Sequence, residues 1–161
     1  MLRSAASTGP KEGWGRMKIE PICSDKKRCL DLLLLADPCE EMVDRYLADG
    51  EMYAVFDGDE IVCECVMHER ADGQIELKNL ATLPSRQRSG LASMLLREMF
   101  RLYAGRYERM YVGTCGAESF YMSLGFRYAY TDAGFFTRNY PEPVIDNGVQ
   151  CIDMVYLVRE L

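Results

Sequence analysis

The chain has 161 residues, of which 48% are hydrophobic and 27% charged, and its formal net charge is −6. These values are typical of one globular domain that can bury a core without disulfides. An acidic chain lacks the basic face that nonspecific nucleic-acid binding needs, and no apolar run approaches the ~20 residues of a membrane-spanning helix. We therefore expect neither a nucleic acid nor a membrane as a partner.

Seven cysteines and a single histidine limit the metal and redox chemistry of the chain. No cysteine pair has the CxxC spacing of zinc sites, so we predict no metal site. The odd cysteine count and the lack of a secretory leader indicate free thiols in a reducing cytoplasm. Cys63 and Cys65 alternate with their neighbours as one face of a strand does, which favours small buried side chains over a redox role.

The first part of the chain is polar, Gly-rich and non-periodic, and it lacks the apolar core of a signal peptide. We expect residues 1–16 to be a disordered leader or a tag. Residues 17–161 are then expected to form a single domain, which opens with an alternating strand over 17–22.

Two helices and three strands are expected next. The first helix, over 25–36, takes Ser24 as its N-cap, and the second takes Asp37 as its N-cap and ends near Gly50. Short Gly-containing turns then separate three strand-like segments, which predicts an antiparallel meander. These segments are 52–56, 61–68 and 75–83.

The most regular helical pattern begins at Leu91, where apolar residues at helical spacing mark one face: Leu91, Met94, Leu95, Met99 and Leu102. A strand over 109–113 follows, and this strand–helix–strand unit predicts a βαβ crossover with a parallel strand pair. A short helix over 120–124, strands over 126–131 and 151–158, and a long aromatic-rich loop between these strands complete the chain. The predicted fold is α+β, with a mixed, mostly antiparallel sheet and flanking helices.

The stretch "LPSRQRSGLASML", residues 83–95, contains the start of that helix. A helix N-terminus offers unpaired N–H groups and a partial positive charge, and is therefore an anion site. Gly90 removes one Cβ there, and Arg86, Gln87 and Arg88 supply donors. Ser89 is a natural N-cap, but its hydroxyl could equally face a ligand. No Lys–Ser/Thr pair of a P-loop is present, so a phosphate that is held rather than cleaved fits best. These residues alone do not separate a phosphate site from a polar helix cap.

Over residues 17–161 the chain resembles the GNAT acetyltransferase superfamily. The family signature, (R/Q)-x-x-G-x-(G/A) between a strand and the long central helix, is matched by Gln87, Gly90 and Ala92. The resemblance implies a GNAT-like fold in which backbone N–H groups of this loop bind the pyrophosphate of acetyl-CoA, a co-substrate, without a metal. The implied cofactor-binding residues are Ala81, Thr82, Leu83, Gln87, Arg88, Ser89, Gly90, Leu91, Ala92 and Ser93. The strand end, Ala81–Leu83, would lie along the pantetheine arm.

A second segment, "SFYMSLGF" at residues 119–126, is similar to a later motif of the family. The resemblance implies that Tyr121 is the general acid that protonates the leaving thiolate. The alternative is that Tyr121 is an aromatic core residue. The Asn that often precedes this helix in the family has no counterpart in "GTCGAES".

Glu76 lies eleven residues before Gln87, at the offset of the general-base Glu in the histone-acetylating branch of the superfamily. Strand parity places it on one face with Lys78, Leu80 and Thr82, and about 13 Å from Leu80. Glu76 would therefore act on the attacking amine through water. The alternative is an exposed carboxylate, or one paired with Lys78.

The developing oxyanion also needs a hydrogen-bond donor. The resemblance implies a backbone N–H of Leu80 or Ala81, where the central strand separates from the next one. His68 is a second candidate base, although a surface position at a hairpin end also fits it.

The tail, Asp132–Met154, is similar to a bacterial GNAT subgroup with an FFxxNYPEP loop. One interpretation is a pocket for a cationic amine walled by aromatic and acidic residues: Phe135, Phe136, Tyr140, Glu142, Asp146 and Asp153. The other is that the aromatics pack the last strand onto the core and the acids are solvated.

The resemblance thus implies an acetyl-CoA-dependent N-acetyltransferase that acetylates a primary amine of a small molecule or peptide by direct attack. The alternative is a non-catalytic acyl-CoA-binding or regulatory module on the same fold. A homodimer is a candidate assembly, and the expected location is the cytoplasm.

Overall fold

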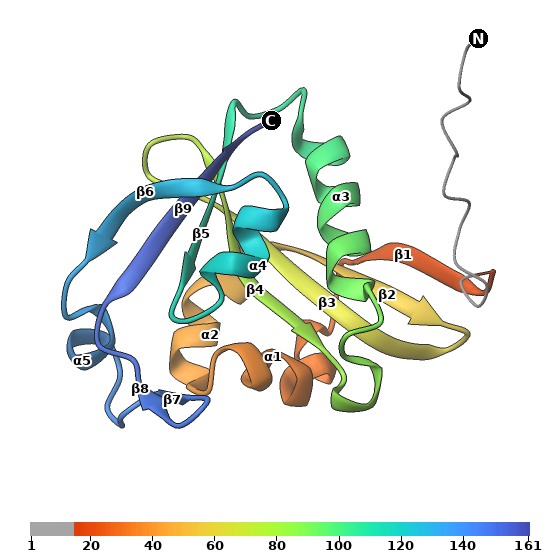
Figure 1. The fold of residues 1–161 in the computed structure, drawn as a ribbon. Helices are drawn as coiled ribbons and strands as arrows, with labels where there is room; N and C mark the ends of the chain where they lie inside the picture. Colours follow the sequence, from red (N-terminus) through yellow and green to blue (C-terminus); the bar gives the residue numbers. More distant parts are fainter. Residues whose placement is uncertain (1–14) are drawn as a thin grey trace, which may run out of the picture.

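The computed structural model describes residues 15–161, so most of the predicted leader lies outside the described residues. This part of the chain forms a seven-stranded sheet of order β1-β2-β3-β4-β5-β9-β6 and a separate two-stranded hairpin, β7-β8 (Figure 1). Within it, no helix is both long and apolar enough to span a membrane.

The elements up to β6 and the last strand follow the predicted order. The strands are β1 (Met17–Ile22), β2 (Glu51–Asp57), β3 (Glu60–Glu69), β4 (Ile75–Thr82), β5 (Arg109–Thr114), β6 (Arg127–Asp132), β7 (Ile145–Asp146), β8 (Val149–Gln150) and β9 (Met154–Glu160). The helices are α1 (Leu30–Ala36), α2 (Glu40–Leu47), α3 (Leu91–Tyr103), α4 (Glu118–Ser123) and α5 (Phe135–Asn139), with short 3-10 helices η1 (Lys26–Cys29) and η2 (Pro84–Arg86).

The sheet is mixed, as predicted. Strands β1 to β4 are antiparallel neighbours, of which β2 to β4 form the predicted meander. Helix α3 carries the chain over to β5, and β4 and β5 are parallel. The parallel pairing covers only Ile75–Leu77 and Met110–Val112, although both strands continue beyond it. The two strands therefore separate in the middle of the sheet, where a parallel partner no longer satisfies their backbone groups.

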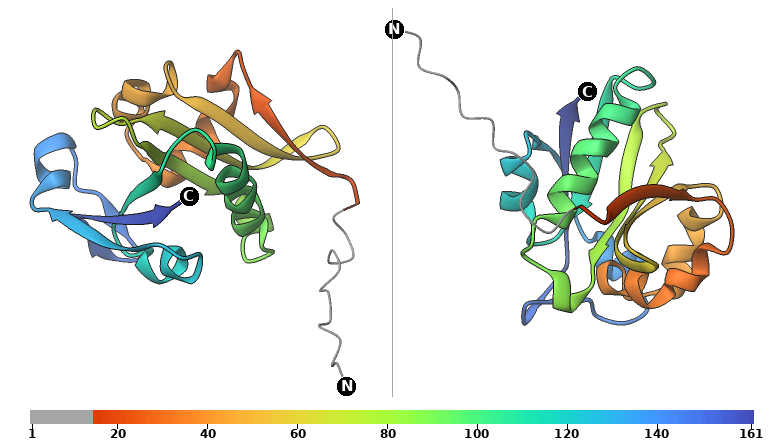
Figure 2. Two further views of the ribbon diagram at one scale, coloured as in Figure 1. Left: turned by 90° about the horizontal axis from the view of Figure 1, so that it is seen from above. Right: turned by 90° about the vertical axis from the view of Figure 1, so that its right-hand side faces the viewer.

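The sheet lies between two helical layers. Figure 2 shows α1 and α2 on one face and α3 and α4 on the other. Helix α3 buries Leu91, Leu95 and Met99 of the predicted apolar face, while Met94 and Leu102 pack at the edge of the same core. On the opposite face, Leu33, Val43 and Tyr46 bury a second core. Apolar burial on both faces holds the layers together.

Both N-caps predicted for the first two helices are wrong. The first helical segment begins as η1, which follows Asp25, and α2 begins at Glu40 after Cys39, without a side-chain cap. Asp37 has extended backbone angles, as a residue before proline prefers. Its carboxylate instead accepts hydrogen bonds from Tyr46 and Tyr140.

A β-bulge in β4 breaks the strand parity assumed from the sequence. Met67 pairs with Leu77 and Val66 with Asn79, so Lys78 has no partner on β3. Leu77 packs in the core beneath α3, which directs Glu76 to the opposite face. Beyond the bulge the alternation shifts, and Leu80 also packs beneath α3. The predicted common face of Glu76 and Leu80 is therefore wrong.

The predicted aromatic-rich loop contains regular structure, namely α5 and the β7-β8 hairpin, and the last strand begins at Met154 rather than Cys151. Cys115, after β5, and Cys151, after β8, form a disulfide with Cα atoms 6.0 Å apart. The prediction of free thiols is wrong for this pair, because the contact joins segments 36 residues apart. The other five cysteines are free, and Cys63 and Cys65 are buried as predicted.

Candidate active site

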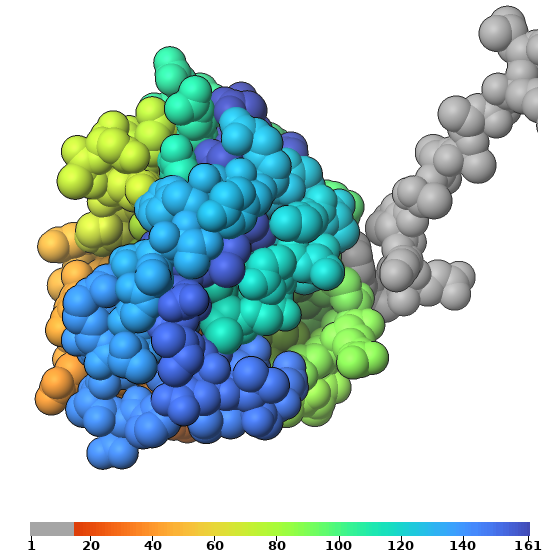
Figure 3. All heavy atoms as spheres, turned by 60° about the vertical axis from the view of Figure 1, so that its left-hand side comes forward, coloured from red at the N-terminus to blue at the C-terminus, as the bar shows by residue number. Residues whose placement is uncertain are grey.

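A cavity of about 780 Å³ lies beside the point where β4 and β5 separate. Its walls come from the α1-α2 connection and α2, from β4, from the loop after β5, and from the C-terminal segment around α5 and β7-β8. Figure 3 shows this C-terminal segment, in blue, between the orange N-terminal helices and the green loop that precedes α3. The cavity thus gathers residues from both ends of the chain.

The loop before α3 presents backbone N–H groups at a helix N-terminus. Arg88 and Gly90 both have left-handed backbone angles, with φ of 59° and 86°. Gly90 is the N-cap, so the predicted Ser89 cap is wrong, and the Ser89 hydroxyl donates to the carbonyl of Arg86. Within residues 15–161 no protein acceptor receives the amides of Arg88, Ser89 and Gly90. These amides are available to an anion.

The side chains predicted to assist this loop are mostly engaged elsewhere. Arg86 forms an ion pair with Asp57 at 2.9 Å, and the Gln87 amide donates to the carbonyl of Thr82 at 3.2 Å. The Thr82 hydroxyl is turned to the core, where it donates to the Cys63 sulfur. Of the three predicted side-chain donors, only Arg88 has no partner in the described chain.

The remaining predicted cofactor residues lie on both sides of this loop. Ala81 and Leu91 are buried, so each can offer a ligand only its backbone. The Leu83 amide is already bonded to the carbonyl of Val62 at 3.0 Å. Ala92 and Ser93 stand in the first turn of α3, where amide groups have no acceptor within the helix.

Tyr121 projects from α4 into the core and also lines the cavity. Its ring packs edge-on against Phe120 and Phe126, and the residue is 8% exposed. Burial, followed by the nearby Cys65, raises the pKa of the Tyr121 hydroxyl, so this group keeps its proton at neutral pH. The hydroxyl has no hydrogen-bond partner among the described residues, yet it is not one of the polar atoms sealed from solvent. The ring of Tyr121 therefore belongs to the core, and the residue also borders the cavity with a hydroxyl that has no partner among the described residues.

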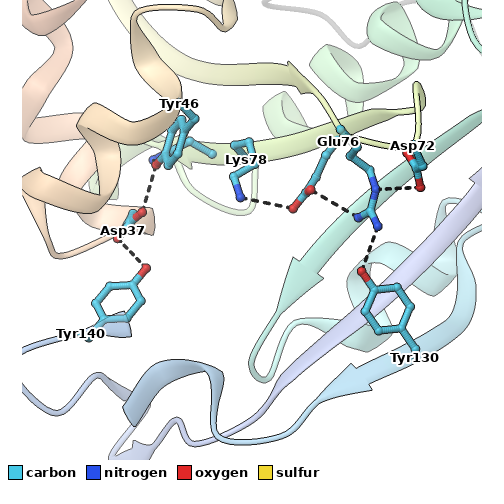
Figure 4. A network of polar contacts seen from close by, with 9 residues as sticks. Asp37, Tyr46, Asp72, Glu76, Lys78, Tyr130 and Tyr140 are labelled. Atoms are coloured by element: carbon cyan, nitrogen blue, oxygen red, sulfur yellow. Dashed lines mark hydrogen bonds and ion pairs between the residues drawn. The ribbon is translucent and has the colours of Figure 1, made fainter. Parts of the chain in front are cut away.

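Glu76 lines the same cavity, and it is buried rather than exposed. Its two oxygens face two cations, Arg70 and Lys78, each at 3.4 Å (Figure 4). Arg70 is held in turn by Asp72 and Tyr130. The contacts to Glu76 are at the long end of hydrogen-bond geometry, so the carboxylate is paired but not tightly clamped.

A polar network that the sequence analysis did not find lies at the other side of the cavity. Tyr46 donates to one oxygen of Asp37 at 3.0 Å and Tyr140 to the other at 2.9 Å (Figure 4). Asn79, on β4, donates to the Tyr46 hydroxyl at 2.9 Å and to the carbonyl of Leu33. Nothing in the sequence signals this network, because its members are up to 103 residues apart.

Only some of the tail residues considered for an amine pocket line the main cavity. Phe135, Phe136, Tyr140 and Asp146 line the cavity. Glu142 borders a separate, smaller cavity, and Asp153 accepts a hydrogen bond from the amide of Gly134. His68 also lines the main cavity, since it pairs with Glu76 across β3 and β4.

Comparison with known proteins decides the family. The model of the GNAT acetyltransferase domain family matches residues 48–128. The chain is 37% identical over 154 residues to the uncharacterized N-acetyltransferase YvbK of Bacillus subtilis strain 168, covering 91% of this chain and 97% of that protein. The chain belongs to the GNAT acetyltransferase family.

Solved GNAT structures extend this result to the fold. An acetyltransferase from Elizabethkingia anophelis with acetyl-CoA bound superposes with a TM-score of 0.84 at 33% identity, over 91% of this chain and 99% of its own. A Bacillus subtilis acetyltransferase in complex with CoA superposes with a TM-score of 0.80 at 34% identity, over 90% of this chain and 99% of its own. The GNAT fold predicted from the sequence is confirmed.

Proposed function

We propose that the protein is an acetyl-CoA-dependent N-acetyltransferase that acetylates a primary amine of a small molecule or peptide by direct attack. The observation that carries the proposal is that one cavity is lined by Gln87 of the phosphate loop, by Glu76 and by Tyr121. Anion-binding amides, a carboxylate and a protonated phenol are the groups that acyl transfer to an amine needs. The acetyl-CoA-bound relative from Elizabethkingia anophelis supports the choice of co-substrate.

In this proposal the loop before α3 holds acetyl-CoA. The free amides of Arg88, Ser89 and Gly90, continued by the first turn of α3, would bind the pyrophosphate, and Arg88 would add a positive charge. Ala81, Thr82 and Leu83 would follow the pantetheine arm with their backbone. When bound, acetyl-CoA supplies an acetyl group activated as a thioester.

Residues around the cavity would stabilise the oxyanion and protonate the leaving sulfur. Backbone N–H groups of Leu80 or Ala81, beyond the point where β4 leaves β5, would donate to the carbonyl oxygen as negative charge develops. Tyr121 would give its phenolic proton to the departing sulfur. The C–N bond forms as the C–S bond breaks, and the products are an acetylated amine and a free thiol.

Glu76 is the proposed base that takes the amine proton, through water. Its exposure to the cavity supports this role, and its contacts with Arg70 and Lys78 fix its position. The alternative is that a water molecule alone takes the amine proton.

We also propose that the chain belongs to the GNAT subgroup with the FFxxNYPEP segment; three aromatic residues of this segment, Phe135, Phe136 and Tyr140, line the cavity. The proposed location is the cytoplasm, which the five free thiols favour and the Cys115–Cys151 disulfide does not. A homodimer remains a candidate assembly.

The function is tested by incubating the protein with acetyl-CoA and a panel of primary amines, with mass spectrometry of the products and assay of the released thiol. We expect at least one amine to gain an acetyl group in step with thiol release. Binding of acetyl-CoA without any acetylated amine would instead identify the non-catalytic acyl-CoA-binding module.

A further inference from the structure

Asp37 is a buried carboxylate without a countercharge. It is 8% exposed and lines the cavity, and within residues 15–161 it forms no ion pair. Among the described residues, its hydrogen-bond donors are the hydroxyls of Tyr46 and Tyr140, one on each oxygen. Buried charges in proteins are normally paired, so this carboxylate lacks a cation that a ligand could supply.

The other charged residues of the cavity do not offer a buried carboxylate that lacks a cation. Glu76 already faces Arg70 and Lys78, and Asp146 is exposed on the β7-β8 hairpin. Lys78 is bonded to Glu76, and no ion pair joins Arg45 to Asp37. Among the described residues, Asp37 is thus the cavity carboxylate that is buried and forms no ion pair, although Arg45 lines the same cavity.

The surroundings of Asp37 suit an alkyl ammonium group. Phe135, Phe136 and Tyr140 pack against one another and line the cavity next to the carboxylate. The faces of aromatic rings attract cations, and the methylene groups of an alkyl ammonium ligand pack well against the rings. Burial, with the charge of Asp37, raises the pKa of both Tyr46 and Tyr140, which therefore remain hydrogen-bond donors to the carboxylate.

The network also places Asp37 close to the proposed reaction centre. Hydrogen bonds of 3.0 and 2.9 Å join Asp37 through Tyr46 to Asn79, the residue next to Leu80 on β4. The acceptor inferred from this arrangement has a short alkyl chain between the cation at Asp37 and the amine near Leu80.

We propose that Asp37 is the anchor for a second cationic group of the acceptor, so that the preferred substrates are short alkyl diamines. One ammonium group pairs with Asp37 between the aromatic side chains, and the other amine, deprotonated, is acetylated. This inference rests on the proposed N-acetyltransferase function, of which it specifies the substrate class.

The test compares a four-carbon alkyl diamine with the four-carbon monoamine in wild type and in Asp37→Asn. The amide keeps the shape of the side chain and one oxygen acceptor but removes the charge. Asp44→Asn is the matched control, because it removes the same charge from an exposed position on the neighbouring helix α2. Calorimetry of acetyl-CoA binding and a melting curve check that each variant is folded.

We expect wild type to use the diamine at least ~10-fold more efficiently than the monoamine, in kcat/KM, as a desolvated ion pair allows. Asp37→Asn should reduce this ratio towards one, mainly through KM, while Asp44→Asn keeps it. Equal use of both amines by wild type, or an unchanged ratio in Asp37→Asn, would overturn the anchor while leaving the acetyltransferase intact.

Direct calorimetric titration with the diamine, without turnover, separates the two proposals. If no amine is acetylated, the proposed function fails, but binding of the diamine that is lost in Asp37→Asn still supports the anchor. Absence of diamine binding to wild type, with and without CoA, contradicts it.

Discussion

Tyr121 and Glu64 are both buried polar side chains without a hydrogen-bond partner in the described chain, but their surroundings differ. The Tyr121 hydroxyl borders the cavity, whereas both Glu64 oxygens are sealed inside the sheet. A free hydroxyl at a cavity is available for chemistry. A sealed carboxylate affects the stability of the fold instead. On folding it either stays charged without its water or becomes protonated, and both cost free energy at neutral pH.

Replacing Tyr121 by Phe tests the general-acid role. The ring packing is retained and only the hydroxyl is lost, so we expect kcat to fall on the order of 10²-fold or more, with acetyl-CoA affinity unchanged. Steady-state kinetics and calorimetry measure the two quantities. Tyr128→Phe is the control, since Tyr128 is exposed on β6. A turnover rate equal to wild type in Tyr121→Phe would assign the residue to the core alone.

Glu64 predicts a pH dependence of stability. Burial raises its pKa from 4.5 to about 8, so the folded state binds a proton that the unfolded state has released. The contribution of Glu64 to the free energy of unfolding is therefore complete below its pKa in the unfolded chain. It is lost as the pH rises towards 8, at about 1.4 kcal/mol per pH unit.

Glu64→Gln should remove that slope. We expect denaturant unfolding at pH 5 and pH 8 to show wild type losing stability relative to Glu64→Gln over this interval. Glu60→Gln, exposed at the start of β3, should follow wild type. Parallel pH profiles for wild type and Glu64→Gln would show that the carboxylate is solvated in the folded protein.

At the scale of elements, the C-terminal segment closes the cavity and is held there by two links to distant parts of the chain. The disulfide joins it to the loop between β5 and α4, and the Tyr140–Asp37 hydrogen bond joins it to the connection between α1 and α2. Both Cys115 and Cys151 line the cavity. The short elements α5, β7 and β8 thus depend on tertiary contacts rather than on their own hydrogen bonds.

A thiol count tests the covalent link. We expect the denatured, unreduced protein to show five reactive thiols and the reduced protein seven. Reduction should also lower the unfolding free energy, on the order of 3 kcal/mol, because it releases a long loop in the unfolded chain. Seven reactive thiols in protein purified without reductant would contradict the pairing.

At the scale of the whole molecule, local patterns predicted most of the fold. The meander, the amphipathic helix α3 and the βαβ crossover follow from spacing along the chain, and the structure confirms each of them. The loop proposed to bind phosphate lies between β4 and α3, where the sequence pattern predicts it. Its conformation was predicted less well, since Gly90 rather than Ser89 caps the helix.

The errors share one physical cause, which is contact between distant segments. The bulge at Lys78 depends on how β4 pairs with β3, and it moved Leu80 to the face opposite Glu76. Asp37 has the sequence of an N-cap, but two tyrosine hydroxyls compete for its carboxylate, one of them from the far end of the chain. The disulfide likewise joins two cysteines whose spacing carries no signal.

The central claim is that the loop before α3 holds acetyl-CoA through its backbone amides. Calorimetric titration with acetyl-CoA of wild type, Gly90→Tyr and Gly73→Tyr tests it most directly. Gly73 is the matched control, because it has the same left-handed backbone as Gly90, with φ of 75°, but lies in open space in the turn before β4. We predict micromolar binding by wild type and Gly73→Tyr and loss of binding in Gly90→Tyr, whose side chain fills the approach to the amides. Equal affinity of Gly90→Tyr and wild type would contradict the account.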